Sequence, residues 1–174
     1  MRRLRGLTTY YVLFFIELKT RVVTIAGVTT NPNAAWMVQM GRNVLDCAGG
    51  AIVNGQKLIL DRDTKNCGDF RRLITDAGGE VIRLPPRAPN LNAYAERFVG
   101  SIKSECLNRL IFFGEASLRR SLRHYVSHYH EARNHQGIGN SLIAANDAHS
   151  GFAGSVARQE RLVGILSYYY RTAA

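Results

Sequence analysis

Two carboxylates stand where they could bind a metal ion. Asp61 directly follows the run Lys57–Leu60 (KLIL), so we expect it at the carboxyl end of a β-strand, where α/β sheets place their ligands. Glu96 comes 35 positions later (96 − 61), after the proline-rich segment 85–90 and near the start of a predicted helix. Paired carboxylates suit Mg²⁺, and two such ions can activate a water and stabilise a leaving phosphate oxygen. The alternative is that Asp61 caps a turn and Glu96 is a solvated helix residue.

Basic and polar residues surround Glu96 in the sequence. Lys103 lies seven positions on and Gly100 four, so all three share one helix face. Lys103 and Arg97 could contact DNA phosphates, and Gly100 would let a backbone approach closely. Lys103 could equally be an ordinary exposed lysine. For Asn92 and Tyr94, contact with nucleotides and a structural role at the helix start remain equal alternatives.

The next predicted helix, from about 115 to 133, has a strongly basic polar side. Its positive residues are Arg119, Arg120, Arg123, His124, His128 and Arg133. Such a face could hold more of a DNA duplex, or it could be a solvated surface. His124 and His128 have the spacing of a zinc pair, but no cysteine or acid completes a zinc site.

Hydrophobic patterning predicts the elements that carry these residues. Residues 10–18 and 22–28 read as a β-hairpin, and Asn31-Pro32 reads as the start of a helix whose stripe is Trp36, Met40, Val44 and Cys47. A strand at 57–60, a helix from Asn66 to the glycines at 78–79, and a strand at 81–84 follow. Next comes a helix over about 92–107, with Ala95, Phe98, Ile102 and Cys106 inside. The basic helix, with Leu118, Leu122, Tyr125 and Tyr129 inside, and a strand-like run at 162–171 follow it. This order predicts an α/β fold.

Composition limits the class of protein. The 174 residues carry 23 basic and 13 acidic side chains, a net charge of +10, which favours a polyanionic partner. Residues 1–30 (five basic, one acidic) and 97–133 (seven basic, three acidic) hold most of the excess. The longest apolar run is too short to cross a bilayer, and three widely spaced cysteines exclude a disulfide framework. We therefore expect a reduced, cytoplasmic protein that has no membrane partner.

Three motifs together resemble one family. They are LILDRDTKNCGDF from residue 58, APNLNAYAERFVGSIKSECLNRL from residue 88, and YHEARNHQGIG from residue 129. In order and spacing they resemble the catalytic core of DDE transposases and retroviral-type integrases, most closely the bacterial insertion-sequence enzymes. Asp61-Arg62 matches the second catalytic Asp with its neighbour, and Glu96-Arg97 matches the catalytic Glu. His130 and Ile138 depart from the family, which has Asn and Leu there.

The resemblance implies an RNase H-like mixed sheet flanked by helices. The family's first catalytic Asp lies on a strand before residue 10, and this sequence has no acidic residue before Glu17. We therefore expect a core that lacks its first, central strand, with residues 1–140 as the integrase catalytic core and 141–174 as a C-terminal tail containing a short strand.

Two function hypotheses follow from this resemblance. The first is a mobile-element integrase or transposase core that binds Mg²⁺ or Mn²⁺ through Asp61 and Glu96 and catalyses phosphodiester hydrolysis and strand transfer in DNA integration and recombination. The second is a catalytically inactive, DNA-binding remnant, since one of three carboxylates is absent. The expected partners are mobile-element ends and target DNA, with a homo-oligomer or a full-length transposase as a protein partner. A basic nucleic-acid-binding module without this ancestry is the third alternative.

Overall fold

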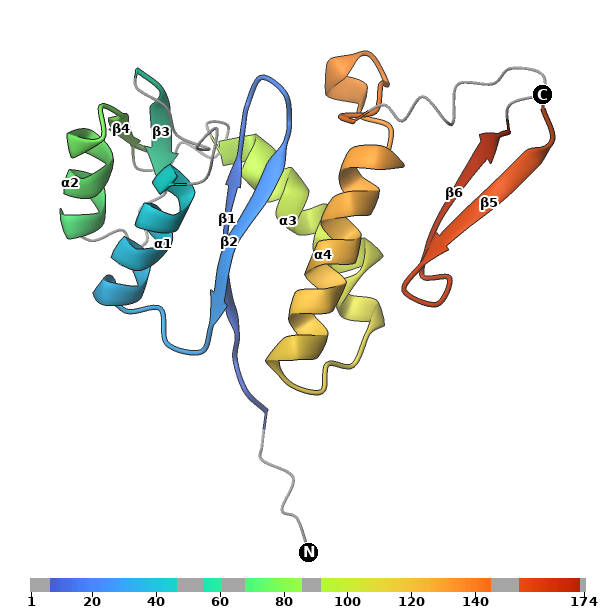
Figure 1. Cartoon of the computed structure of the whole chain (residues 1–174), viewed down its shortest axis with the longest axis horizontal. Helices are drawn as coiled ribbons and strands as arrows, with labels where there is room; N and C mark the ends of the chain where they lie inside the picture. The colour runs from blue at the N-terminus through green and yellow to red at the C-terminus, as the bar shows by residue number, and fades with distance from the viewer. Residues whose placement is uncertain (1–6, 47–54, 61–67, 86–91, 145–153, 173–174) are drawn as a thin grey trace, which may run out of the picture. The chain divides into compact units, whose positions relative to one another are not determined.

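The computed structural model of the chain describes residues 7–46, 55–60, 68–85, 92–144 and 154–172 (Figure 1). They form a mixed α/β structure, which confirms the predicted class. The chain divides into two compact units, one comprising residues 1–15 and 24–93 and the other residues 16–23 and 94–174. Whether the functional boundary falls at residue 140 stays a prediction.

The first unit contains two small sheets and two helices. Strands β1 (Tyr11–Ile16) and β2 (Val23–Thr29) form the predicted hairpin. Strands β3 (Lys57–Leu60) and β4 (Glu80–Arg83) pair in parallel, with Lys57 opposite Glu80 and Leu60 opposite Arg83. Helix α1 (Ala34–Asp46) follows the hairpin, and helix α2 (Gly68–Asp76) connects β3 to β4 in the sequence.

Helix α1 begins two residues later than the sequence predicted. The Oδ1 atom of Asn33, not Asn31, accepts a hydrogen bond from the Trp36 amide at 2.9 Å, as an N-cap residue does. The buried stripe is correspondingly Met37, Gly41 and Val44, with Trp36 half-buried beside it. Cys47 lies outside the described residues. The Asn31-Pro32 signal was misleading because Asn33, one residue further on, competes for the same capping role.

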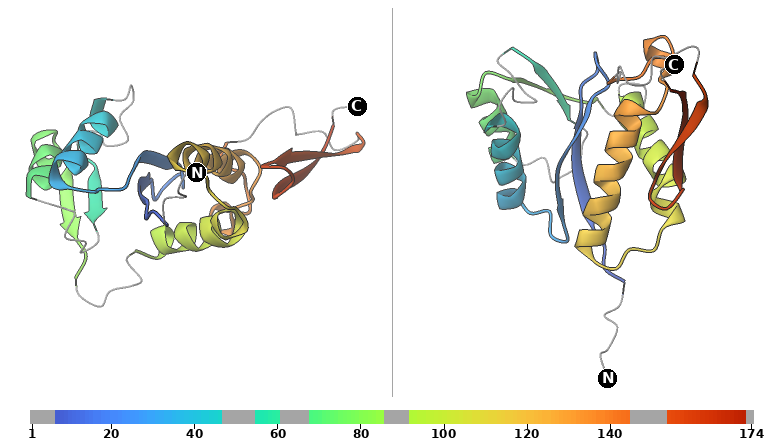
Figure 2. Two further views of the ribbon diagram at one scale, coloured as in Figure 1. Left: turned by 90° about the horizontal axis from the view of Figure 1, so that it is seen from below. Right: turned by 45° about the vertical axis from the view of Figure 1, so that its right-hand side comes forward.

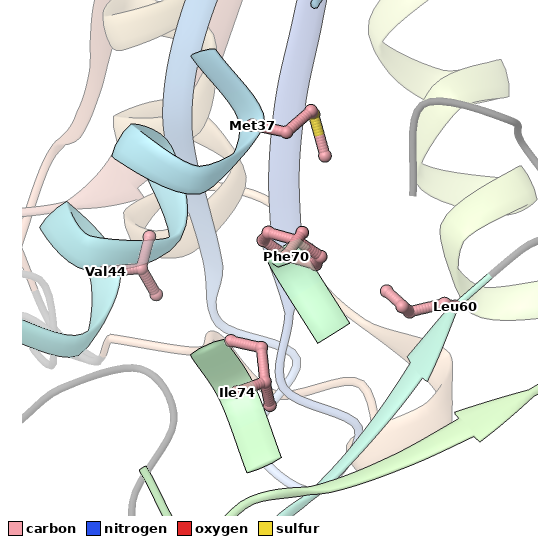
Figure 3. Packing of buried hydrophobic residues seen from close by; sticks show 5 residues of the cluster. All are labelled: Met37, Val44, Leu60, Phe70 and Ile74. Carbon is pink, nitrogen blue, oxygen red and sulfur yellow. The ribbon is translucent and has the colours of Figure 1, made fainter. Parts of the chain in front are cut away.

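One aliphatic cluster holds the first unit together. Its buried members are Met37, Val44, Leu60, Phe70 and Ile74 (Figure 3), and β1, β2 and β4 each pack at least one partly buried side chain against them. Gly41 allows α1 to approach α2 closely, because a Cβ atom there would lie 2.9 Å from Leu73 and 3.0 Å from Phe70. Helix α2 ends at Asp76, shortly before the predicted stop at Gly78, whose φ of +83° favours glycine.

The second unit is built on two helices. Helix α3 (Ala93–Glu105) and helix α4 (Glu115–Glu131) lie side by side in both views of Figure 2, joined through the 3₁₀ turn η2 (Leu107–Arg109). Of the residues predicted to face inward, Ala95 is only half-buried. The others are buried: Phe98, Ile102, Cys106, Leu118, Leu122, Tyr125 and Tyr129. The ring centroids of Phe98 and Tyr129 are 5.2 Å apart. The inward faces of α3 and α4 were therefore predicted correctly except at Ala95.

A C-terminal hairpin completes the described structure. After the 3₁₀ turn η3 (Gln136–Ile138), strands β5 (Val156–Arg161) and β6 (Leu166–Arg171) pair antiparallel, with Val156 opposite Arg171. The sequence predicted only the second strand. Strand β5 was missed because VARQER is mostly polar, although its alternating exposure is that of a half-buried strand.

Candidate functional site

Glu96 lies in the first turn of α3, and its side chain is exposed. It forms no ion pair with any residue in the described part of the chain, so its carboxylate oxygens are available to a ligand. Lys103 is exposed in the last turn of the same helix. A Cβ atom built on Gly100, between them, would meet nothing within 4 Å. The predicted face of Glu96, Gly100 and Lys103 is therefore open to an approaching molecule.

Asp61 is the other predicted catalytic residue. It follows Leu60, the last residue of β3, but positions 61–67 lie outside the described residues. The meeting of Asp61 with Glu96 thus stays a prediction. Within the described residues, no group of three or more His, Cys, Asp or Glu side chains is placed to hold a metal ion. Carboxylate oxygens, as on Glu96, are the donors that Mg²⁺ prefers.

The start of α3 differs in environment from the Glu96 face. Asn92 is half-buried just before the helix, and Tyr94 is 39% exposed. The guanidinium carbon of Arg21, from the turn of the β1–β2 hairpin, lies 3.7 Å from the centroid of the Tyr94 ring. This is a close cation–π stack. Arg97, one turn further along α3, is exposed.

The basic residues of α4 and Arg133, which follows this helix, differ in their exposure and in whether they already form an ion pair. Arg119 is exposed and forms an ion pair with Glu115 at 2.7 Å. Arg120, Arg123 and His124 are exposed as well. Arg133 is half-buried and donates to Glu105 at 2.9 Å. Although burial disfavours its charged form, Glu105 raises the pKa of Arg133 above its ordinary value. Of the predicted DNA contacts, Arg123 is thus the most accessible on α4 and Arg133 the most engaged internally.

A polar network lies beneath this surface. The hydroxyl of Tyr125, which is fully buried, donates to the second oxygen of Glu105 at 3.0 Å. Burial, reinforced by Glu105, raises the pKa of Tyr125 far above its usual range, so it stays protonated. Glu105, on α3, is therefore bound both to Tyr125 on α4 and to Arg133, just beyond the end of α4. The sequence showed no signal for this network, because Glu105 reads as a surface residue of an amphipathic helix.

Two histidines, His130 in the last turn of α4 and His135 after it, each form a hydrogen bond with a backbone group. The Nε2 atom of His130 accepts a hydrogen bond from the Val23 amide at 3.0 Å. The Nε2 atom of His135, 2.8 Å from the Tyr129 carbonyl, must carry the proton of that hydrogen bond. Burial lowers the pKa of both rings. His130 is one of the two positions where the sequence departs from the motif it resembles, and here it binds the backbone of Val23 to α4.

Comparisons with known proteins relate parts of this chain to an integrase domain and to an insertion-element protein. Residues 78–141, which include α3 and α4, match the family model described as integrase core domain. An uncharacterized 39.2 kDa protein of insertion element IS476 from Xanthomonas euvesicatoria is 39% identical over 62 residues, which are 36% of this chain and 18% of that protein. The aligned segment is thus less than a fifth of the curated relative.

A solved structure shares the fold. It is a chain of the simian T-cell lymphotropic virus intasome in complex with PP2A regulatory subunit B56 gamma, which matches 93% of this chain and 65% of its own length with a TM-score of 0.54. At 9% sequence identity the likeness concerns the fold alone. None of the described helices is long and apolar enough to cross a membrane. Residues 78–141 are thus similar to an integrase core domain, and part of the chain is similar to an insertion-element protein.

Proposed function

We propose that the chain is a DNA-acting integrase core of a mobile element, which hydrolyses and transfers phosphodiesters with the help of divalent metal ions. The observation that carries this proposal is the exposed carboxylate of Glu96 in the first turn of α3, inside the segment that matches the integrase core domain. Among the described residues it has no ion-pair partner. Its place in the ERF sequence is the place of the catalytic Glu in the family's motif.

Asp61 and Glu96 are the proposed metal-binding residues. Both offer oxygen donors, which fit Mg²⁺ or Mn²⁺. Bound ions would polarise the scissile phosphate and lower the pKa of an attacking water. The part played by the protein is to present the Glu96 carboxylate on the exposed side of helix α3. The open surface at Gly100 leaves room for a DNA strand beside that carboxylate.

The residues proposed to contact DNA are ranked by how exposed they are and by whether they already have a partner. Arg97, Lys103 and Arg123 are exposed and would neutralise phosphates. Asn92 and Tyr94 would contact nucleotides at the start of α3, and Arg119 would exchange Glu115 for a phosphate. Arg133 ranks last among these contacts, because binding DNA would require it to leave Glu105. Other copies of the chain or a full-length transposase are the proposed protein partners.

The RNase H-like architecture, with a strand position between β1 and β3, belongs to the same proposal. Two features of the first unit support it. The strands β1–β2 and β3–β4 are separate two-stranded sheets in the described structure, and both sheets pack against the one aliphatic cluster. One further strand between them would join the two pairs into a single mixed sheet.

A specific observation favours a second candidate function, a DNA-binding protein without catalysis. Residues 1–16 contain no acidic side chain, so the family's first catalytic Asp has no counterpart there. Both candidates require salt-dependent DNA binding, and only the first requires metal-dependent chemistry. The two are therefore separable in one set of reactions.

The test is nicking of supercoiled plasmid by the purified chain with Mg²⁺ or Mn²⁺. The first candidate predicts nicking that is abolished in Glu96→Gln and Asp61→Asn, and retained in the control Asp76→Asn, which changes an exposed carboxylate on α2. Plasmid binding without nicking in the wild-type chain would establish the second candidate. Binding that is absent, or indifferent to salt, would contradict both.

A further inference from the structure

The turn of the β1–β2 hairpin holds an arginine in an unusual conformation. Arg21 has a φ of +66°, in the left-handed region that side chains other than glycine rarely adopt. Backbone hydrogen bonds hold it there: its amide donates to the Glu17 carbonyl at 2.8 Å, and the Glu17 amide donates to Val22 at 2.9 Å. Backbone strain of this kind is often found at functional positions.

The guanidinium of Arg21 is held on two sides and leaves one edge without a bonded acceptor among the described residues. One face stacks on Tyr94 at 3.7 Å. Its Nη1 atom donates to the Leu18 carbonyl. The opposite edge, formed by Nε and Nη2, lies beside Gly137, where a Cβ atom would be 3.9 Å from both nitrogens. No acceptor within the described ranges bonds to that edge, which has the parallel N–H geometry that binds two oxygens of a phosphate.

The charge around Arg21 is not balanced. Burial raises the pKa of Tyr129, and the positive charges of Arg133, Arg21 and Arg97 each oppose that rise. Arg133 is paired with Glu105. Among the residues that the structure describes, neither Arg21 nor Arg97 has a carboxylate within ion-pair distance. A half-buried cation without a counter-ion is costly, and a bound anion would remove that cost.

This group lies on its own side of α3. Tyr94 and Arg97 are three positions apart and share a face, whereas Glu96 is two positions from Tyr94 and points elsewhere. We propose that Arg21, held flat on Tyr94, binds a phosphate of the DNA backbone through its Nε–Nη2 edge, with Arg97 as a second contact. The DNA would therefore cross the start of α3 and reach beyond the Glu96 face. This inference rests on the proposed DNA binding but not on catalysis.

The experiment measures binding of the full chain to a fluorescently labelled duplex of about 30 base pairs across a series of KCl concentrations. The affinity falls with salt by a slope of about 0.9 per phosphate contact. We expect Arg21→Gln to weaken binding about tenfold and to reduce the slope by about one contact. The matched control is Arg42→Gln on α1, an exposed arginine, which should leave both nearly unchanged.

A second variant tests the geometry without changing any charge. Gly137→Leu would cover the Nε–Nη2 edge, and the backbone there does not require glycine because its φ is not positive. We expect this variant to lose about as much affinity as Arg21→Gln while keeping the wild-type melting temperature. Equal slopes for Arg21→Gln, Arg42→Gln and the wild type would overturn the inference and leave DNA binding intact. A wild-type chain that does not bind the duplex would overturn the proposed function as well.

Discussion

The two units of the chain bury different kinds of side chain. The first closes on aliphatic residues and one phenylalanine, namely Met37, Val44, Leu60, Phe70 and Ile74. The second combines Phe98, Tyr125 and Tyr129 with the half-buried ion pair of Glu105 and Arg133. The first unit thus depends on the volume that its side chains fill, and the second depends also on every polar group keeping its partner.

The largest expected effect is in the aliphatic cluster. Phe70, 1% exposed, touches the region where α1 and α2 meet at Gly41. Phe70→Ala should lower the free energy of unfolding by about 3–5 kcal/mol, because the cavity cannot close fully. Urea unfolding followed by circular dichroism measures the change. The control is Phe113→Ala, whose ring is 85% exposed, and a loss there as large as at Phe70 would contradict the assignment of the core.

The next effect tests the polar core of the second unit. Glu105→Leu removes the acceptor of both Arg133 and Tyr125, and we expect a loss of about 2 kcal/mol in the free energy of unfolding. Glu115→Leu, which breaks the exposed pair with Arg119, should cost less than about 1 kcal/mol. Similar losses in the two variants would mean that the network adds no stability beyond an ordinary surface pair.

The aliphatic cluster follows from the sequence better than the polar core does. Phe70 and Ile74 in α2, and Phe98 and Ile102 in α3, repeat at helical spacing, so periodicity alone placed them inside. Glu105 and Arg133 are 28 positions apart, and no local pattern pairs them. Arg21 was missed for a related reason: its contact with Tyr94 depends on how the hairpin turn packs on α3, which propensity does not encode. Of the predicted site, Glu96 and Lys103 were placed on one open face because both are on the same helix.

A smaller effect distinguishes the units by their response to acid. Burial lowers the pKa of His128, His130 and His135, all in the second unit. The folded state therefore favours the neutral rings. The contribution of these neutral rings to the free energy of unfolding should be complete above the ordinary histidine pKa of about 6.5. That contribution should be lost as the pH falls below this value. His130 in particular cannot accept the Val23 amide once it is protonated.

Thermal melts between pH 8 and pH 5 measure this dependence. We expect the melting temperature to fall with the pH below about 6.5, and His130→Gln to make that fall shallower, since glutamine has no proton to gain. A wild-type melting temperature that rises on acidification would have the wrong sign for neutral, buried histidines.

The smallest effect is at the surface of the parallel pair β3–β4. Lys57 and Glu80 are opposite each other at 3.3 Å, with both side chains mostly exposed. Glu80→Gln should change the free energy of unfolding by less than about 0.5 kcal/mol, and less still in high salt. A loss above 1 kcal/mol in urea unfolding would show that this pair matters more to the first unit than its exposure allows.

The central claim is that Asp61 and Glu96 hold metal ions together, and Mn²⁺ binding tests it most directly. Titration of the full chain with Mn²⁺, in the presence of duplex DNA and followed by electron paramagnetic resonance, counts bound ions without requiring catalysis. We predict saturable binding that is lost in Asp61→Asn and equally in Glu96→Gln, and retained in Asp76→Asn. Wild-type binding in both Asp61→Asn and Glu96→Gln would contradict the claim.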